Sequence, residues 1–509
     1  MDVFVRSAMT RVFPALLSVF AGCSFALDSG QTQCSIDDDC SHFDDGPEFT
    51  GRAVCQAGIC VNSHLGPKGC SLGEPASPDD FANRCTAAKT LEFDNCTRLH
   101  LCDDGALTGA MSTKVAPMAL GGAPPLVTHQ ATPTDKCTDV LTNIIYVTGS
   151  TNLPPLIKAV QPLLDMGSPA YTVVFAPQTS CKGAAAIYDP DASKHVIVNA
   201  VDNYAFYYKN GQQTFCLLDT AGNTVDVGES DVYPQSCGYP QTQGIADYPG
   251  PIQAITFVVP PGSRQTAISA EAAHLVFGAG SNQNQAAPWT DPNLYFIRSS
   301  GTGTVQLPSR AIGIEPASWW GIDRSSAQNL VDSMKLVNPL KAEQAIGILS
   351  SDFADKNRAN LKVLAFQQHG QRTAYFPDSS FDASDKANVR DGHYPIWGSI
   401  HFMAPTVGDV PTEKARALIQ QLAVPKLEKS VVEAIIEAGY VPPCAMSVTH
   451  SAEVGPLSSF VPELSCSCYF DYLAIGATSC KTCSNSSECN GPTESCNYGY
   501  CDKVKPPTG

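Results

Sequence analysis

The chain has 509 residues, 43% of them hydrophobic, so it can bury a large core and form more than one domain. Its formal net charge of −17 makes nucleic acid an unfavourable partner. Its 21 cysteines are too many to stay reduced and unliganded in a cytosolic protein, so we expect an oxidising compartment.

A short apolar segment, Val12 to Gly22, follows Arg6 and Arg11 at the N-terminus. It is too short to span a bilayer and has the layout of a signal peptide. The small residues before Cys23 are similar to a bacterial lipobox, so we predict a signal peptide over residues 1–22 and a lipid anchor on Cys23. An ordinary secretory signal is the alternative. No later segment predicts a transmembrane helix.

The 20 cysteines that remain after Cys23 form clusters within residues 34–102, 137–237 and 444–501. The first and last clusters share a C-x5-C, C-x4-C spacing, which predicts a repeated disulfide module of open connectivity. Zinc is the alternative, although Cys480-x2-Cys483 is the only C-x2-C pair. We therefore predict a cysteine-rich module at 23–102, a linker at 103–137, a binding domain at 138–443 and a second cysteine-rich module at 444–509.

Strand-like and helix-like apolar segments alternate between residues 138 and 443, which predicts an α/β domain. Ligands of such sheets bind beyond the carboxyl ends of the strands, where this chain places polar, hydroxyl-rich loops. The predicted strands are 143–147, 171–175, 255–259 and 294–297, and the predicted helices are 154–164, 269–277, 412–423 and 429–438.

One of these loops is Arg298-Ser299-Ser300-Gly301-Thr302-Gly303-Thr304, between a predicted strand and a helix start. A glycine-rich loop at a helix start presents backbone N–H groups to an anion. Arg298 adds a guanidinium that can bind two oxygens at once. The loop therefore predicts a tetrahedral oxyanion as ligand, and a plain Ser/Gly/Thr turn is the alternative.

Five segments resemble, in order, the phosphate-specific binding proteins of ABC transporters, within the type II periplasmic binding protein superfamily. Thr148 to Pro154 resembles the first phosphate loop, and Glu229-Ser230-Asp231 resembles an Ala-Ser-Asp segment. Trp289-Thr290-Asp291 resembles a Trp-x-Asp segment, and Ala345 to Ile348 an Ile-Gly-Tyr strand. Arg298 to Thr304 resembles the Arg-x-Asp-Gly-Ser-Gly-Thr anion loop. The resemblance implies a two-lobed α/β fold of this superfamily, flanked by small disulfide-rich modules.

The resemblance also implies a site built from both lobes. Asp231 would discriminate between ligands, because a buried carboxylate tolerates an anion only if the anion brings a proton. Two residues depart from the family pattern: Ser300 replaces an acidic residue, and Asn152 replaces an aromatic one. The implied ligand-binding residues are Ser150, Thr151, Asn152, Ser180, Lys182, Gly183, Asp231, Arg298, Thr302, Gly303 and Thr304.

The expected function is binding of phosphate or a related oxyanion outside the cytoplasm, for uptake, scavenging or sensing. Expected partners are the oxyanion, an ABC permease, and a membrane through the lipid anchor. No nucleophile elbow, Walker loop or clustered metal carboxylates occur, so we expect no enzyme, metal or cofactor. Asp391 and His393 are interpreted as a structural pair rather than a catalytic one. The alternatives are a surface interaction protein with a lost or altered ligand and, third, a phosphoester hydrolase.

Overall fold

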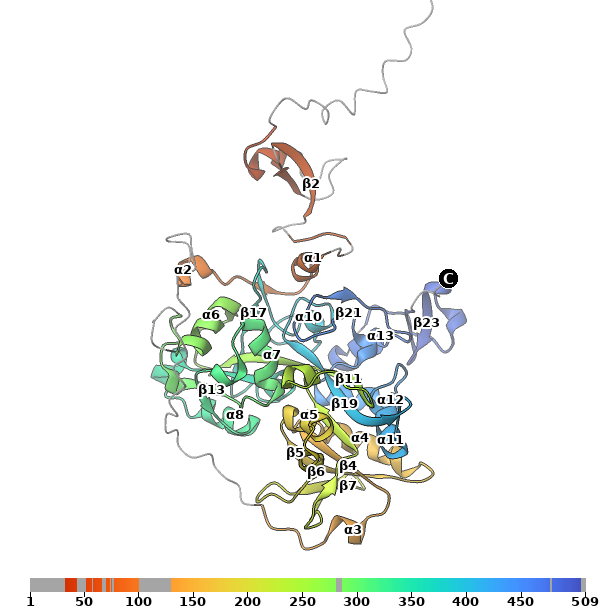
Figure 1. The fold of residues 1–509 in the computed structure, drawn as a ribbon. Coiled ribbons are helices and arrows are strands. Elements are labelled where there is room, and N and C mark those ends of the chain that lie inside the picture. The colour runs from red at the N-terminus through yellow and green to blue at the C-terminus, as the bar shows by residue number, and fades with distance from the viewer. Residues whose placement is uncertain are drawn as a thin grey trace, which may run out of the picture. The chain divides into compact units, whose positions relative to one another are not determined.

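The computed structural model describes residues 33–43, 52–56, 58–65, 70–73, 75, 77–99, 130–280, 286–476 and 478–504. The chain divides into two compact units, Met1–Glu74 and Pro75–Gly509 (Figure 1). The predicted signal peptide, Cys23 and most of the predicted linker lie outside the described residues. Among the described residues, no helix combines the length and the apolar character that crossing a membrane requires. The domain boundaries drawn from the cysteine clusters stay predictions, although residues 77–99 belong to the second unit.

The first unit contains a disulfide-stapled hairpin. A short helical turn, η1 (Asp37–Phe43), precedes the antiparallel strands β1 (Arg52–Gln56) and β2 (Ile59–Leu65). Disulfides join Cys34 to Cys55 and Cys40 to Cys60, so the first cysteine pairs with the third and the second with the fourth.

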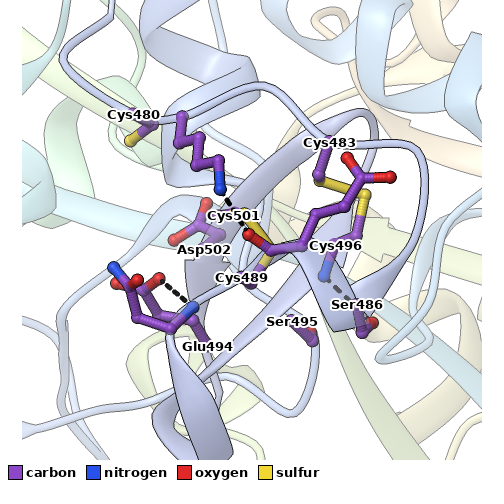
Figure 2. The surroundings of a disulfide bond; sticks show 12 residues. Cys480, Cys483, Ser486, Cys489, Glu494, Ser495, Cys496, Cys501 and Asp502 are labelled. Atoms are coloured by element: carbon purple, nitrogen blue, oxygen red, sulfur yellow. Dashed lines mark hydrogen bonds between the residues drawn. A yellow bond between two sulfur atoms is a disulfide. The ribbon is translucent and has the colours of Figure 1, made fainter.

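The C-terminal end repeats this module, and Figure 2 shows the surroundings of its disulfides. Disulfides Cys483–Cys496 and Cys489–Cys501 have the same connectivity, and the last two cysteines again face each other across a hairpin. The Cys496 N–H donates to Ser486 Oγ at 3.1 Å, as the Cys55 N–H donates to Asp37 Oδ1 at 3.0 Å. The predicted repeat is confirmed. The zinc alternative is wrong, because Cys480 is bonded to Cys468 and Cys483 to Cys496. The elements are η11 (Ser486–Glu488), β23 (Glu494–Asn497) and β24 (Tyr500–Lys503).

A mixed sheet forms the centre of the second unit, in the order β14-β13-β15-β11-β19-β10-β4-β5-β7-β8, with β16 beside β11 and β20 beside β19. The β4 and β5 strands are parallel, as are β13 and β15, so their carboxyl ends face the same way within each group. The strands are β4 (Ile144–Ser150), β5 (Thr172–Gln178), β7 (Ala205–Lys209), β8 (Gln212–Cys216), β10 (Val227–Ser230), β11 (Ile245–Val259), β13 (Tyr295–Ile297), β14 (Ile322–Asp323), β15 (Ile346–Ser350), β16 (Lys362–Val363), β19 (Trp397–Val407) and β20 (Val410–Pro411).

Two long strands divide this sheet into lobes. The first part of β11 pairs with β19, the register shifts between Pro249 and Ile252, and the last part pairs with β15. The chain therefore leaves the first lobe (β4, β5, β7, β8 and β10) along β11, builds the second lobe (β13 to β16) and returns along β19. The predicted α/β class with two lobes and disulfide-rich ends is confirmed.

Amphipathic helices cover the sheet. In α4, for example, Leu156, Ile157, Val160 and Leu164 recur at helical spacing and are all buried. The predicted helix at 269–277 is shorter: α6 ends at His274, and a π-helical turn follows, whose Phe277 carbonyl accepts the Trp320 N–H. The helices are α4 (Pro154–Asp165), α5 (Ser180–Tyr188), α6 (Ala270–His274), α7 (Gly303–Ile312), α8 (Ala327–Lys335), α9 (Ser351–Lys356), α11 (Glu413–Leu422), α12 (Lys429–Ala438) and α13 (Ser467–Ile475).

Both flanks of the second unit pack onto its α/β core. The strand β3 (Thr90–Leu91) is the edge of a small sheet with β12, β17 and β18, and the Cys444–Cys466 disulfide closes a strap over residues 444–466. The remaining short elements are α1 (Pro78–Asn83), α2 (Asn95–Leu99), α3 (Cys137–Val140), β6 (Val196–Ile197), β9 (Asn223–Thr224), β12 (Ala267–Ser269), β17 (Ala365–Gln367), β18 (Ala374–Tyr375), α10 (Ala387–Arg390), β21 (Val448–Thr449) and β22 (Ser458–Ser459).

Candidate functional site

Three strand-to-helix junctions carry the predicted site residues. The end of β4 leads to Ser150 and α4, the end of β5 leads to Ser180 at the start of α5, and the end of β13 leads to Arg298 and α7. Asp231 directly follows β10, which lies parallel to β4. The first two junctions and Asp231 belong to the first lobe, and Arg298 belongs to the second.

Asp231 is the centre of this arrangement and is only 3% exposed. Its Oδ2 accepts a hydrogen bond from Ser180 Oγ at 2.8 Å, and its Oδ1 accepts one from Asn152 Nδ2. Ser180 Oγ in turn accepts the Gly303 N–H at 2.9 Å. A chain of hydrogen bonds therefore connects Asp231 of the first lobe to the start of α7 in the second.

The two lobes also touch through their backbones at this point. The Cys181 N–H donates to the Gly301 carbonyl at 3.0 Å. A Cβ atom at Gly303 would lie 2.4 Å from Asp231 Cβ, a distance that real Cβ atoms do not reach, so this contact requires glycine. The structure is therefore closed at the candidate site.

Arg298 brings a positive charge to the closed site. It is 8% exposed, and its Nη2 donates to the Ser325 carbonyl at 3.0 Å. Its Nε is buried and has no hydrogen-bond partner among the described residues. Burial lowers the pKa of Arg298, and the charges of Asp323 and Asp231 oppose that shift. One guanidinium donor is thus left without a protein acceptor.

Burial raises the pKa of Asp231, while hydrogen bonds from Ser150, Ser180 and Asn152 and the charge of Arg298 pull it back down. The donors that the sequence assigned to a ligand therefore stabilise this carboxylate in the closed structure.

Glu229 is a site residue that the sequence analysis missed. It lies two residues before Asp231, is fully buried, and its Oε2 accepts the Ser150 N–H at 2.5 Å. Its Oε1 has no hydrogen-bond partner among the described residues. Burial, and then the charge of Asp231, raise the pKa of Glu229 well above its ordinary value. Residues two positions apart in extended chain lie on the same face. This spacing is the signal that could have placed Glu229 beside Asp231.

Glycines bring the three first-lobe segments together. A Cβ atom at Gly183 would lie 1.8 Å from the Glu229 carbonyl oxygen, and one at Gly149 would lie 2.2 Å from it. The backbones of β4, α5 and β10 can approach this closely only without side chains. These glycines therefore fix where Glu229 lies relative to Ser150.

Other predicted donors are engaged elsewhere or face solvent. The N–H groups of Lys182 and Gly183 donate to Thr179, and the Lys182 side chain is exposed. Thr302 Oγ1 donates to the Ser299 carbonyl at 2.8 Å. Thr151 is exposed and Thr304 is half-buried. Ser150, Asn152, Ser180, Asp231, Arg298 and Gly303 are the predicted residues that the structure brings together.

Asn152 links the site to the second lobe. Its Nδ2 also donates to Gln253 Oε1 at 3.2 Å, and Gln253 Nε2 donates to Asp352 Oδ1 at 3.2 Å. The Tyr440 hydroxyl donates to the Asn152 carbonyl at 3.0 Å, and Tyr440 also lines a cleft of about 590 Å³ together with Asp352. Asn152 Oδ1 is buried and has no partner among the described residues.

The other conspicuous polar residues have structural contacts. His393 is fully buried. Its Nδ1 lies 2.7 Å from Asp391 Oδ1, and its Nε2 lies 2.7 Å from the Arg84 carbonyl oxygen. Trp319 packs on Phe277 in the core, with their ring centroids 4.8 Å apart. The groups with metal-ligand spacing in the described part of the chain are cysteines that already form disulfides.

No family model and no curated protein matches the sequence. Solved structures are similar to part of it. An ABC-type phosphate transport receptor from Vibrio cholerae is 14% identical, with a TM-score of 0.40, and the match covers 59% of this chain and 100% of that one. A phosphate binding protein from Stenotrophomonas maltophilia is 12% identical, with a TM-score of 0.33, over 58% of this chain and 90% of that one. A Corynebacterium glutamicum OxyR mutant is 10% identical, with a TM-score of 0.32, and the match covers 58% of this chain and 67% of that one.

Proposed function

We propose that this chain is an extracytoplasmic solute-binding protein that takes phosphate or a related oxyanion between its two lobes. The observation that carries the proposal is Arg298, a buried cation whose Nε has no acceptor in the described part of the chain. Leaving a buried donor unpaired costs about 1–3 kcal/mol of free energy, and more for a charged group. An anion that accepts a hydrogen bond from Arg298 Nε would remove this cost, which favours binding.

The neighbouring residues fit an oxyanion ligand. The starts of α5 and α7 meet at Ser180 and Gly303, and helix N-termini favour negative charge. Asp231 can accept a hydrogen bond only from a ligand oxygen that carries a proton, which hydrogen phosphate has and sulfate lacks at neutral pH. This predicts a preference for phosphate on the order of a thousandfold.

Ligand exchange requires the lobes to separate. In the closed structure Ser180 Oγ bonds both Asp231 and the Gly303 N–H, so these groups become available only when the second lobe moves away. Hinge closure around a ligand is a common motion of two-lobed proteins. The crossing strands β11 and β19 connect the lobes and are the elements about which such a hinge would form.

The disulfides support an extracytoplasmic location, because such bonds persist in oxidising compartments. The lipid anchor on Cys23 and delivery to an ABC permease are further parts of the proposal. Both rest on the sequence resemblance.

A surface interaction protein that has lost its ligand is the second candidate. It is favoured by the closure itself, since Asp231 already accepts from Ser180 and Asn152, and Glu229 already accepts from Ser150. In that case the acidic side chains replace the ligand permanently. The two candidate functions differ in whether the closed site opens and binds an added anion.

Isothermal titration calorimetry of the full-length oxidised protein with phosphate, arsenate and sulfate separates the two candidates. We expect micromolar or tighter phosphate binding, similar arsenate binding and much weaker sulfate binding, with Asp231→Asn reducing the preference over sulfate. Arg310→Ala, an exposed position on α7, is the control and should bind as wild type does. Absence of heat with all three anions would leave the interaction protein as the better proposal.

A further inference from the structure

The closed site has more hydrogen-bond acceptors than an inorganic anion can use. Glu229 Oε1 and Asn152 Oδ1 are both buried without a partner among the described residues, and both side chains lie beside Asp231. Buried polar atoms are normally paired, and an unpaired acceptor points to a donor that is absent from the bare protein. A phosphate oxygen is itself an acceptor and cannot fill this role unless it carries a proton.

The formal charges point in the same direction. Glu229 and Asp231 together carry up to two negative charges, whereas Arg298 is the cation that acts on Asp231. Adding a dianion to such a site would increase the negative charge, because like charges at short range repel each other strongly in a buried environment. A ligand that brings its own positive group would relieve this imbalance.

We propose that the ligand is a zwitterion: an oxyanion, such as a phosphate ester or phosphonate, joined by a short linker to an ammonium group. This inference rests on the proposed function of the same site. The anionic end would bind Arg298 and the start of α7, and the ammonium would donate to Glu229 Oε1 and Asn152 Oδ1. An ammonium has three donors, which matches these two oxygens and one oxygen of Asp231.

Glu229 is the residue that sets this specificity. Its Oε2 accepts the Ser150 N–H beside β4 in the first lobe, whereas Arg298 belongs to the second lobe, so a ligand that binds both residues would extend from one lobe to the other. Burial raises the pKa of Glu229, and a bound ammonium would lower it again, because a neighbouring positive charge favours the ionised carboxyl.

The test is competition calorimetry on the full-length oxidised protein with 2-aminoethyl phosphate, ethyl phosphate, inorganic phosphate and ethanolamine. Ethyl phosphate differs from 2-aminoethyl phosphate by the amine alone. We expect wild type to bind 2-aminoethyl phosphate about tenfold or more tightly than ethyl phosphate, since a hydrogen bond to a charged group contributes about 1.5–3 kcal/mol.

Glu229→Gln should bring the ratio of the two affinities close to one, whereas Glu437→Gln, an exposed position on α12, should keep the wild-type ratio. If Glu229→Gln fails to fold, the wild-type competition decides alone. Ethyl phosphate or inorganic phosphate binding as tightly as 2-aminoethyl phosphate overturns the zwitterion and leaves the oxyanion-binding function intact. No binding by any of the three phosphates overturns the proposed function itself.

Discussion

Asp231 and Glu229 are two carboxyl groups buried within one site, an arrangement that costs free energy if both are ionised. Asp231 is compensated by three side-chain donors and by Arg298, whereas Glu229 accepts only the Ser150 N–H among the residues that the structure describes. Glu229 is therefore the group that remains protonated more readily. The same carboxyl gives the site its proposed specificity and a measurable pH dependence.

Glu229→Gln should remove part of the pH dependence of stability. Because the folded-state pKa of Glu229 is raised, the folded protein binds more protons than the unfolded one, and stability falls as the pH rises above the unfolded pKa near 4.5. The free energy of unfolding of Glu229→Gln minus that of wild type should thus increase from pH 4.5 to pH 8. Denaturant titrations in phosphate-free buffer measure this difference, and a difference independent of pH would contradict it.

Gly303→Ala should weaken the closed state, although alanine favours helices over glycine by about 0.5–1 kcal/mol. The new Cβ would lie 2.4 Å from Asp231 Cβ, and overpacking costs about 1–3 kcal/mol, so the clash outweighs the propensity gain. Thermal melting should show destabilisation. Gly262→Ala is the control, because its Cβ would meet Ala342 Cβ at 3.5 Å, and it should melt as wild type does.

At the scale of elements, the site is made where loops from different lobes meet. The positions of these loops could be predicted, because apolar strands followed by Ser, Thr and Gly are read directly from the chain. Their bonding partners could not be predicted. Ser180 bonds Asp231, 51 residues away, and Gly303, 123 residues away, and no local pattern encodes such pairings. Lys182 was misleading for a local reason: Thr179 caps α5 and takes the N–H groups expected to face a ligand.

The contact between Thr179 and Gly301 offers a way to lock the lobes. A Cβ at Gly301 would lie 3.8 Å from Thr179 Cβ, within the range that disulfides span. In the oxidised double variant Thr179→Cys/Gly301→Cys, phosphate added after oxidation should not bind. The second lobe would then stay closed over the donors around Ser180. Calorimetry with phosphate measures this, with each single variant as control.

The native Cys181 lies close to the same point, since its Cβ would be 3.8 Å from a Cβ at Gly301. Peptide mapping must therefore establish that the new bond joins residues 179 and 301 and that Cys181–Cys237 is intact. A correctly locked protein that binds phosphate with wild-type affinity would show that entry does not require the lobes to separate.

At the scale of the whole molecule, the two ends of the chain carry the same disulfide module in different settings. The cysteines predicted the repeat because both clusters share the C-x5-C and C-x4-C spacings, but their spacing left the connectivity open. The sequence did not predict how the C-terminal copy attaches. Tyr498 stacks on Tyr469 of α13, and its hydroxyl donates to the Leu427 carbonyl at 2.8 Å. The corresponding residue of the first module is Ala57, which has no aromatic ring.

Removal of residues 1–65 should leave the second unit as stable as it is in the full chain. The hairpin module carries its own two disulfides and belongs to a separate compact unit, and the truncation retains Cys70. Differential scanning calorimetry of both proteins should give the same main transition. A main transition shifted by several degrees would mean that the first module stabilises the binding domain.

The most direct measurement is calorimetric titration of phosphate into wild type, Arg298→Ala and Arg310→Ala under identical conditions. If Arg298 binds the anion, Arg298→Ala should lose about a hundredfold or more in affinity, since a buried charge-assisted contact contributes up to about 3 kcal/mol. Arg310→Ala, at an exposed position on α7, should match wild type. Wild-type phosphate affinity in Arg298→Ala would contradict the proposal that the anion binds between the lobes at this residue.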